Sequence, residues 1–385
     1  HPLLCNKQQK KLSCGFFFAS AQVEGGSGCS RWRAQSAAAQ NTWLSVGWSP
    51  QLHLLVAVAY DGFGNQVMTS TDGVTWYNRT TPIPASSGQW FSVTWSPELT
   101  LFVAVSDYLS GNRVMTSPDG VTWTPRATVS NGWQSVTWSP QLGIFVAVAS
   151  YDVDGNPVMT SEDGEIWVTR SALQEAWRSV VWSPELGIFV AVGNTGVSRA
   201  MTSSDGEIWT PRSSPINDWV SVAWSPERGL FVAVADPGGG GGNDGVMTSP
   251  DGESWTLRTL PVNNSWSSVT WSSERGIFLA LARMGSDMGA MVSTDGVSWH
   301  VQHTLPNMWN SVTWSPELKL FVAVGTSSLL SGVMTSYQAV FNTSITSPME
   351  GDSFLYSEQV HSVTWSSGGD DVLVDIQLWR NNSMV

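Results

Sequence analysis

The chain has 385 residues, of which 42% are hydrophobic and only 13% are charged, and its formal net charge is −13. Three of its four lysines (Lys7, Lys10 and Lys11) lie near the start, so no basic stripe is available to bind a nucleic-acid backbone. No apolar run reaches the roughly 18 residues that a membrane-spanning helix needs.

Residues 1–29 form an N-terminal extension that carries all three cysteines, Cys5, Cys14 and Cys29. An odd number of clustered cysteines suits one intrachain disulfide plus one thiol that pairs elsewhere, and the alternative is three free thiols. Because the chain begins at His1 rather than Met, we expect a processed or partial product. Scarce lysine, these cysteines and four N-glycosylation sequons favour an extracellular or cell-surface protein; the sequons are at Asn78, Asn263, Asn342 and Asn381.

Residues 30–340 contain a repeat of about 44 residues. Each copy has a first segment W-x-S-V-x-W-S, an apolar run such as Ile144–Val148, a V-M-T-S segment, and a Trp segment after an Asp-Gly turn. Such short runs, rich in β-branched and aromatic residues and separated by turns, predict four antiparallel strands. Seven copies predict an all-β, seven-bladed β-propeller. The first segments begin at Trp43, Trp90, Trp133, Trp177, Trp219, Trp266 and Trp309.

Both faces of each blade are expected to be buried, because every blade is sandwiched between two neighbours. In the first strand of the third copy, simple alternation predicts that Trp133 points to one face while Val136 and Trp138 point to the other. The Asp-Gly turns, such as Asp119-Gly120, suit tight hairpins because they accept positive φ.

The ring is expected to close through Trp32. The seventh copy reaches Val333–Ser336 and then lacks its Asp-Gly-x-x-Trp segment, which leaves a blade of three strands. Trp32 lies 11 residues before Trp43, within the range of 10 to 14 residues that separates the other fourth-strand tryptophans from the next copy. The N-terminal segment around Trp32 is therefore predicted to supply the missing outer strand and to remove the open edge.

The turn motif Ser-x-Asp-Gly-x-x-Trp occurs six times and resembles the Asp-box, or BNR, repeat of sialidase-like propellers, in a form one residue shorter than usual. The resemblance covers residues 30–340 and implies a fold rather than an activity. We interpret the motif as structural: Ser and Asp oxygens accept backbone N–H groups, Gly is left-handed, and Trp packs between blades. An Arg three residues after the Trp in five copies is interpreted as a packing or ion-pair element. The six aspartates are Asp72, Asp119, Asp163, Asp205, Asp251 and Asp295.

Residues 341–385 resemble the opening of the Ig-like module of Ser/Thr-rich, GPI-anchored wall proteins, and are expected to form part of a β-sandwich. Val372, Val374, Ile376 and Leu378 alternate strictly, so this strand needs one buried face. We predict that a neighbouring copy completes the segment. The alternatives are docking onto its own propeller and completion by chain beyond Val385.

No catalytic, cofactor or metal site is expected. A sialidase-like hydrolase would need three converging arginines, a Tyr–Glu pair and an acid Asp, yet only Arg178 departs from the repeat pattern in a first strand. His300-x-x-His303 is interpreted as a solvated pair. Asp152-Val-Asp154 resembles the start of a calcium loop but lacks the later Glu.

Strand order places the first-to-second and third-to-fourth turns on one face, and the variable second-to-third loops and blade links on the other. Recognition is expected on the variable face. The first hypothesis is a non-enzymatic, glycosylated building block of a cell-surface or matrix assembly, with a fibre as one form, whose partners are copies of itself or other surface proteins. The second is a glycan-binding lectin that uses exposed aromatics among Tyr60, Phe63, Tyr108 and Tyr151. A glycoside hydrolase is disfavoured.

Overall fold

The computed structural model describes the strand Phe18–Gln22 and residues 32–62, 65–81, 89–107, 113–151, 155–236, 244–283, 289–326 and 331–336. It also describes four short strands between residues 344 and 384. The chain divides into two compact units: Ser30–Gln338, and a second unit that combines His1–Cys29 with Ala339–Val385. In the described part, no helix has the length and apolarity of a membrane span.

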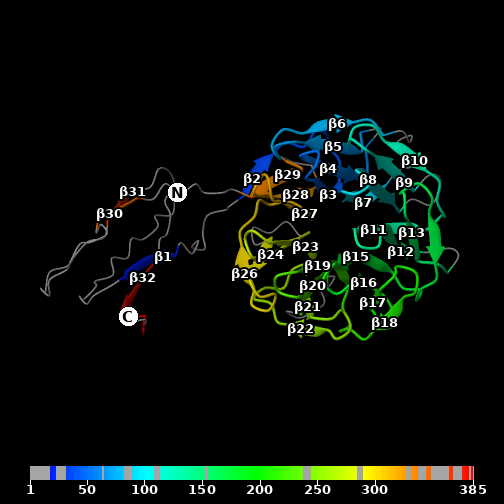
Figure 1. Cartoon of the computed structure of the whole chain (residues 1–385). Helices are drawn as coiled ribbons and strands as arrows, with labels where there is room; N and C mark the ends of the chain where they lie inside the picture. The colour runs from blue at the N-terminus through cyan, green and yellow to red at the C-terminus, as the bar shows by residue number, and fades with distance from the viewer. Residues whose placement is uncertain are drawn as a thin grey trace, which may run out of the picture. The chain divides into compact units, whose positions relative to one another are not determined.

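The unit Ser30–Gln338 is a ring of seven four-stranded antiparallel sheets, a seven-bladed β-propeller (Figure 1). The first strands lie innermost: β3 (Trp43–Ser49), β7 (Trp90–Ser96), β11 (Gly132–Ser139), β15 (Trp177–Ser183), β19 (Trp219–Ser225), β23 (Trp266–Ser272) and β27 (Trp309–Ser315). The second strands are β4 (Leu54–Ala59), β8 (Leu101–Ser106), β12 (Ile144–Tyr151), β16 (Ile188–Gly193), β20 (Leu230–Ala235), β24 (Ile277–Ala282) and β28 (Leu320–Gly325).

The two outer strands of each blade are short. The third strands are β5 (Val67–Ser70), β9 (Val114–Ser117), β13 (Val158–Ser161), β17 (Ala200–Ser203), β21 (Val246–Ser249), β25 (Ala290–Ser293) and β29 (Val333–Ser336). The fourth strands are β6 (Tyr77–Arg79), β10 (Thr124–Arg126), β14 (Val168–Arg170), β18 (Thr210–Arg212), β22 (Thr256–Arg258), β26 (His300–Gln302) and, in the seventh blade, β2 (Trp32–Gln35).

The N-terminal strand closes the ring, as predicted. β2 pairs with β29 in an antiparallel register that sets Trp32 opposite Ser336 and Gln35 opposite Val333. The side chain of Trp32 is buried in the same apolar cluster as Trp309 and Trp314 of the seventh blade. The sheet order β2-β29-β28-β27 therefore leaves no three-stranded blade.

Burial on both faces of a blade comes from the second strands. In β12, Phe145, Ala147 and Ala149 pack into one apolar cluster, while Val146 and Val148 pack into the next cluster around the ring. Alternate residues of one fully buried strand thus supply two neighbouring interfaces, and the apolar run needs no polar positions.

The prediction that Trp133 faces away from Val136 and Trp138 is wrong. All three side chains lie in one cluster, because the pairing of β11 with β12 shifts register between Trp133 and Ser135. A β-bulge adds one residue to one strand and so reverses the side-chain alternation beyond it. The same shift recurs at the start of each first strand, for example between Trp177 and Ser179.

Two sets of hydrogen bonds join every blade to the next. The first-strand Ser hydroxyl accepts from a Val amide of the following blade, as Ser135 Oγ does from Val180 N at 3.2 Å. The second of the two Trp residues in each first strand donates to a Glu or Gln in the first-to-second turn of the preceding blade. Trp224 Nε1, for example, donates to Glu185 at 2.6 Å. The bond from Trp48 to Glu317, at 2.7 Å, carries this second set across the closure between the seventh and first blades.

The second unit contains two small sheets. β1 (Phe18–Gln22) pairs with β32 (Asp375–Arg380), which also pairs with β33 (Ser383–Met384). β30 (Ser344–Ser347) pairs with β31 (Thr364–Ser366). The chain's own strand β1 thus occupies one edge of β32, and completion of residues 341–385 by a neighbouring copy stays a prediction. Cys5, Cys14 and Cys29 lie outside the described residues.

Candidate functional site

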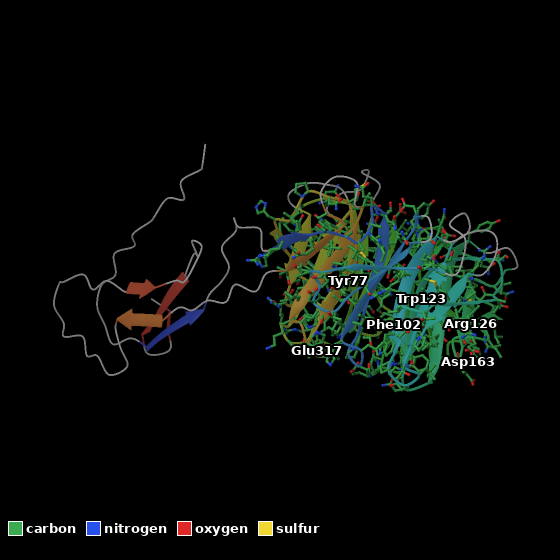
Figure 2. The ribbon with its side chains drawn as sticks, turned by 90° about the horizontal axis from the view of Figure 1, so that it is seen from above. Tyr77, Phe102, Trp123, Arg126, Asp163 and Glu317 are labelled. Atoms are coloured by element: carbon green, nitrogen blue, oxygen red, sulfur yellow. The ribbon has the colours of Figure 1, made fainter. Side chains whose placement is uncertain are left out.

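The strand order gives the ring two different faces. The hairpin face carries the first-to-second and third-to-fourth turns, and the loop face carries the second-to-third loops and the links between blades. Asp163 and Glu317, from two different kinds of turn, lie at the same edge of the ring (Figure 2). We describe the hairpin face first.

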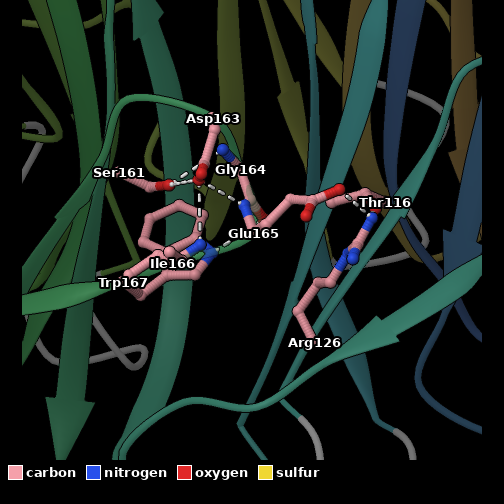
Figure 3. A network of polar contacts seen from close by, with 8 residues as sticks. All are labelled: Thr116, Arg126, Ser161, Asp163, Gly164, Glu165, Ile166 and Trp167. Carbon is pink, nitrogen blue, oxygen red and sulfur yellow. Dashed lines mark hydrogen bonds and ion pairs between the residues drawn. The ribbon is translucent and has the colours of Figure 1, made fainter.

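Each Ser-x-Asp-Gly-x-x-Trp hairpin is held by its own Asp. In the third blade, Asp163 Oδ1 accepts from the backbone amides of Glu165 and Ile166, both at 2.8 Å, and from the Ser161 hydroxyl at 3.1 Å (Figure 3). Trp167 Nε1 donates to Gly164 O at 3.0 Å. Gly164 has φ of +74°, in the left-handed region that favours glycine.

The other five hairpins repeat this arrangement. In each, the Asp carboxylate accepts two backbone amides at 2.7–2.9 Å; these residues are Asp72, Asp119, Asp205, Asp251 and Asp295. Burial alone would raise the pKa of Asp295, but the amides of Ser298 and Val297 and the Ser293 hydroxyl lower it to about 2. The carboxylates are thus ionised at neutral pH and serve as hairpin caps.

Three of the five Arg residues that follow a hairpin Trp join neighbouring blades through ion pairs, in line with the interpretation of this Arg as a packing or ion-pair element. Arg126 Nε donates to Thr116 in its own blade at 3.0 Å, and its guanidinium reaches Glu165 of the next blade at 2.5 Å (Figure 3). Equivalent ion pairs join Arg170 to Glu207 and Arg212 to Glu253.

On the loop face, three consecutive blades contribute one polar chain, which we call the inner polar chain: Asp107, directly after β8, Gln134 in β11 and Arg178 in β15. Arg178 Nη1 donates to Gln134 Oε1 at 2.8 Å, and Gln134 Nε2 donates to Asp107 Oδ2 at 2.5 Å. Arg178, in β15, is the residue that departs from the repeat pattern. Its Nε is buried and has no hydrogen-bond acceptor among the described residues.

Burial disfavours the charged forms of Arg178 and Asp107 in the inner polar chain. Burial lowers the pKa of Arg178, and Arg283 lowers it further, against attraction from Asp107, Asp218 and Asp236. Burial raises the pKa of Asp107, partly offset by Arg178 and the Gln134 hydrogen bond. Arg178 thus feels one neighbouring guanidinium, that of Arg283, and three carboxylates, those of Asp107, Asp218 and Asp236.

Further charged pairs continue around the same face. Arg199 contacts Asp218 at 3.2 Å, and Arg283 lies 4.0 Å from Asp236. Arg113, which the sequence reasoning did not single out, is fully buried and donates to Asn131 O at 2.6 Å.

Aromatic residues on the loop face are only partly described. Tyr60 is exposed and makes an edge-to-face contact with Phe91, with ring centroids 5.9 Å apart. Tyr151 is also exposed. Phe63 and Tyr108 lie outside the described residues.

Two predicted glycosylation sites can be placed. Asn78 is exposed in β6, where its Nδ2 donates to Ala38 O at 2.8 Å. Asn263 is exposed in the link before β23. Asn342 and Asn381 lie outside the described residues, as do Asp152 and Asp154. In the described part of the chain, no group of three or more His, Cys, Asp or Glu side chains is placed to hold a metal ion.

No protein-family model matches the sequence, and no curated protein matches it. Among solved structures, the chain is similar to a streptogramin B lyase, with 8% identity and a TM-score of 0.65 over 79% of this chain and 96% of the other. It is also similar to virginiamycin B lyase from Staphylococcus aureus (8%, TM-score 0.64, 79% and 97% covered) and to a chain of a mitotic checkpoint complex (13%, TM-score 0.59, 88% and 98% covered). At such identities the similarity establishes the propeller fold and says nothing of activity.

Proposed function

We propose that this chain is a non-enzymatic, glycosylated propeller subunit of an extracellular assembly at a cell surface or in a matrix, with a fibre as one form of it. Its partners are copies of itself or other surface proteins. The six hairpins are Asp-box repeats in a shortened form, and residues 341–385 correspond to the opening of an Ig-like module.

The observation that carries this proposal is the uniform use of the hairpin carboxylates. In every Asp of the motif, one carboxylate oxygen accepts hydrogen bonds from two backbone amides, as Asp163 Oδ1 does from Glu165 and Ile166. A catalytic blade would be expected to differ from the others, whereas here the hairpins act as repeated structural caps. The seven-fold set of blade-to-blade bonds also supports a rigid building block.

The test is the state of the full chain secreted from a eukaryotic host. Sedimentation velocity and low-resolution electron microscopy should find particles larger than one chain, and intact mass should exceed the 41.7 kDa of the bare chain because of N-glycans. A monodisperse monomer at all concentrations would overturn the assembly, and a bare-chain mass would overturn the glycoprotein.

A second function, a lectin for acidic glycans, is favoured by two observations on the loop face. Arg178 offers a buried Nε without an acceptor among the described residues, and Tyr60 with Phe91 presents an aromatic surface to solvent. Uronic-acid and sialylated glycans should then bind the parent but not Arg178→Gln, and neutral glycans should bind neither. Equal binding of neutral and acidic glycans would refute it.

A further inference from the structure

Blades three and four present exposed apolar side chains on the hairpin face. Ile166 and Ile208 occupy the position before the hairpin Trp and are 72% and 73% exposed, and Leu142 and Leu186, in the first-to-second turns, are 41% and 43% exposed. The other four motif hairpins have Thr or Ser at the Ile position. We call these four residues the hairpin patch.

A groove runs along the outer side of the patch. It has a volume of about 500 Å³, lies between the hairpins of the fourth and fifth blades, and is lined by Leu186, Ile208, Asp205, Arg212 and Glu253 among others. The lining thus combines aliphatic side chains with carboxylates. Such a groove fits an extended segment that offers both aliphatic and cationic side chains.

Acidic side chains outnumber basic ones around the patch. The turns and fourth strands of blades three and four contain six carboxylates and two guanidinium groups, those of Arg170 and Arg212. Both guanidinium groups are already engaged with Glu207 and Glu253. A third guanidinium, from Arg126 of the second blade, pairs with Glu165. Burial alone would raise the pKa of Asp205, but backbone amides of Ile208 and Glu207 and the Ser203 hydroxyl lower it, so the carboxylate stays charged at neutral pH.

The chain itself contains one segment with the complementary chemistry. Residues 1–12, HPLLCNKQQKKL, hold three of the four lysines together with three leucines and no acidic residue. The rest of the sequence has a single lysine, Lys319. Lysine stems and leucine side chains can cover Ile and Leu while the ammonium groups meet carboxylates at the rim.

We propose that the hairpin patch is a docking surface for residues 1–12 of a second copy of this chain. Donor segment and acceptor patch are different surfaces, so the contact is head-to-tail and extends the chain of subunits unless rotation closes it into a ring. The inference rests on the proposed assembly function and names the contact that would build it.

Peptide binding tests the surface directly. The probe is a labelled peptide of residues 1–12 with Cys5→Ser, added to full chain carrying Lys7→Gln, Lys10→Gln and Lys11→Gln so that its own segment does not compete. We expect saturable binding that weakens with salt and falls about tenfold or more in an added Ile166→Ser/Ile208→Ser pair. The matched control is Val197→Ser/Ile216→Ser, which removes two equally exposed apolar residues from the loop face. Equal loss in patch and control variants, or no saturable binding, would overturn the proposal.

Mixing two defective chains tests the assembly. The lysine variant cannot donate and the Ile166→Ser/Ile208→Ser variant cannot accept, so each should be monomeric alone, while a mixture should form capped dimers by sedimentation velocity. Parent-like assembly of the patch variant would overturn the inference while leaving the proposed function intact. Peptide binding to the patch without any assembly of the parent would overturn both the proposed assembly and the docking of a second copy.

Discussion

Replacing Trp32 with Ala should destabilise the propeller more than the same change at an equivalent Trp. Trp32 is 8% exposed and Trp123, at the corresponding position of the second blade, is 5% exposed. Loss of a buried Trp costs about 3–5 kcal/mol, which for a unit of this size lowers Tm by roughly 5–10 °C. Both variants should show this packing loss.

The difference between the two variants measures ring closure. Strand β10 is linked to its partner β9 by a short hairpin, so after a local opening it returns easily. Strand β2 meets β29 across the whole propeller: Gln35 donates to Thr335, 300 residues away, at 3.0 Å. Lengthening a closing loop from about 10 to about 300 residues costs an upper bound of about 3 kcal/mol more.

Urea unfolding with the m-value monitored, together with trypsin cleavage at Arg33 under native conditions, checks this prediction. Trp32→Ala should unfold at lower urea than Trp123→Ala and should be cleaved faster at Arg33 than the parent. If Trp32→Ala melts within a degree or two of the parent, the closure by β2 is not what holds the ring. If the two variants are equally stable, closure adds nothing beyond packing.

Three further changes have defined outcomes. Thr100 has φ of +48° at the position where Gly143 of the next blade has +66°. In urea unfolding, Thr100→Gly should stabilise the propeller and Gly143→Thr should destabilise it, each by about 1 kcal/mol. Backbone strain alone decides the second effect, because a Cβ at Gly143 meets nothing within 4 Å. The pKa of Asp295 is about 2 in the folded state and 3.8 in the unfolded state. The stability that its charge contributes is therefore present above about pH 4 and lost as the pH falls toward 2. Asp295→Asn should flatten the dependence of unfolding free energy on pH in that window. Asn78→Gln and Asn263→Gln should each lower the intact mass by one glycan, and an unchanged mass would count against occupancy of that site.

The ring was predictable because seven copies of one pattern reinforce each other. A single W-x-S-V-x-W-S segment would be ambiguous, but its recurrence identifies the blade, and the one defective copy points to Trp32. The face assignment of Trp133 failed because a β-bulge separates it from Val136, and the segment Trp-Gln-Ser contains no Gly or Pro that would mark a bulge.

The sequence pointed to only part of the candidate site. Arg178 departs from the repeat and was therefore noticed. Its partners come from neighbouring blades, Gln134 from 44 positions earlier in the chain and Asp107 from 27 positions before that. The offset between neighbouring blades decides which of their side chains come into contact, and no sequence pattern within one blade predicts that offset. The recurring Glu or Gln in the first turn was a missed signal, since each accepts from a Trp of the next blade.

The pairing of β32 changes where an assembly contact should be sought. An unpaired apolar strand at the C-terminus would invite a strand from another copy. In the structure, β32 has β1 on one edge, with Phe18 opposite Trp379 and Ala21 opposite Ile376, and β33 on the other. A strand from a neighbour would have to displace β1 on one edge, whereas on the other edge β33 pairs only with Trp379 and Arg380. Deleting residues 341–385 would expose β1 rather than simply remove a connector. Assembly contacts that leave these pairings intact can use the propeller, which offers its loop face and the hairpin patch.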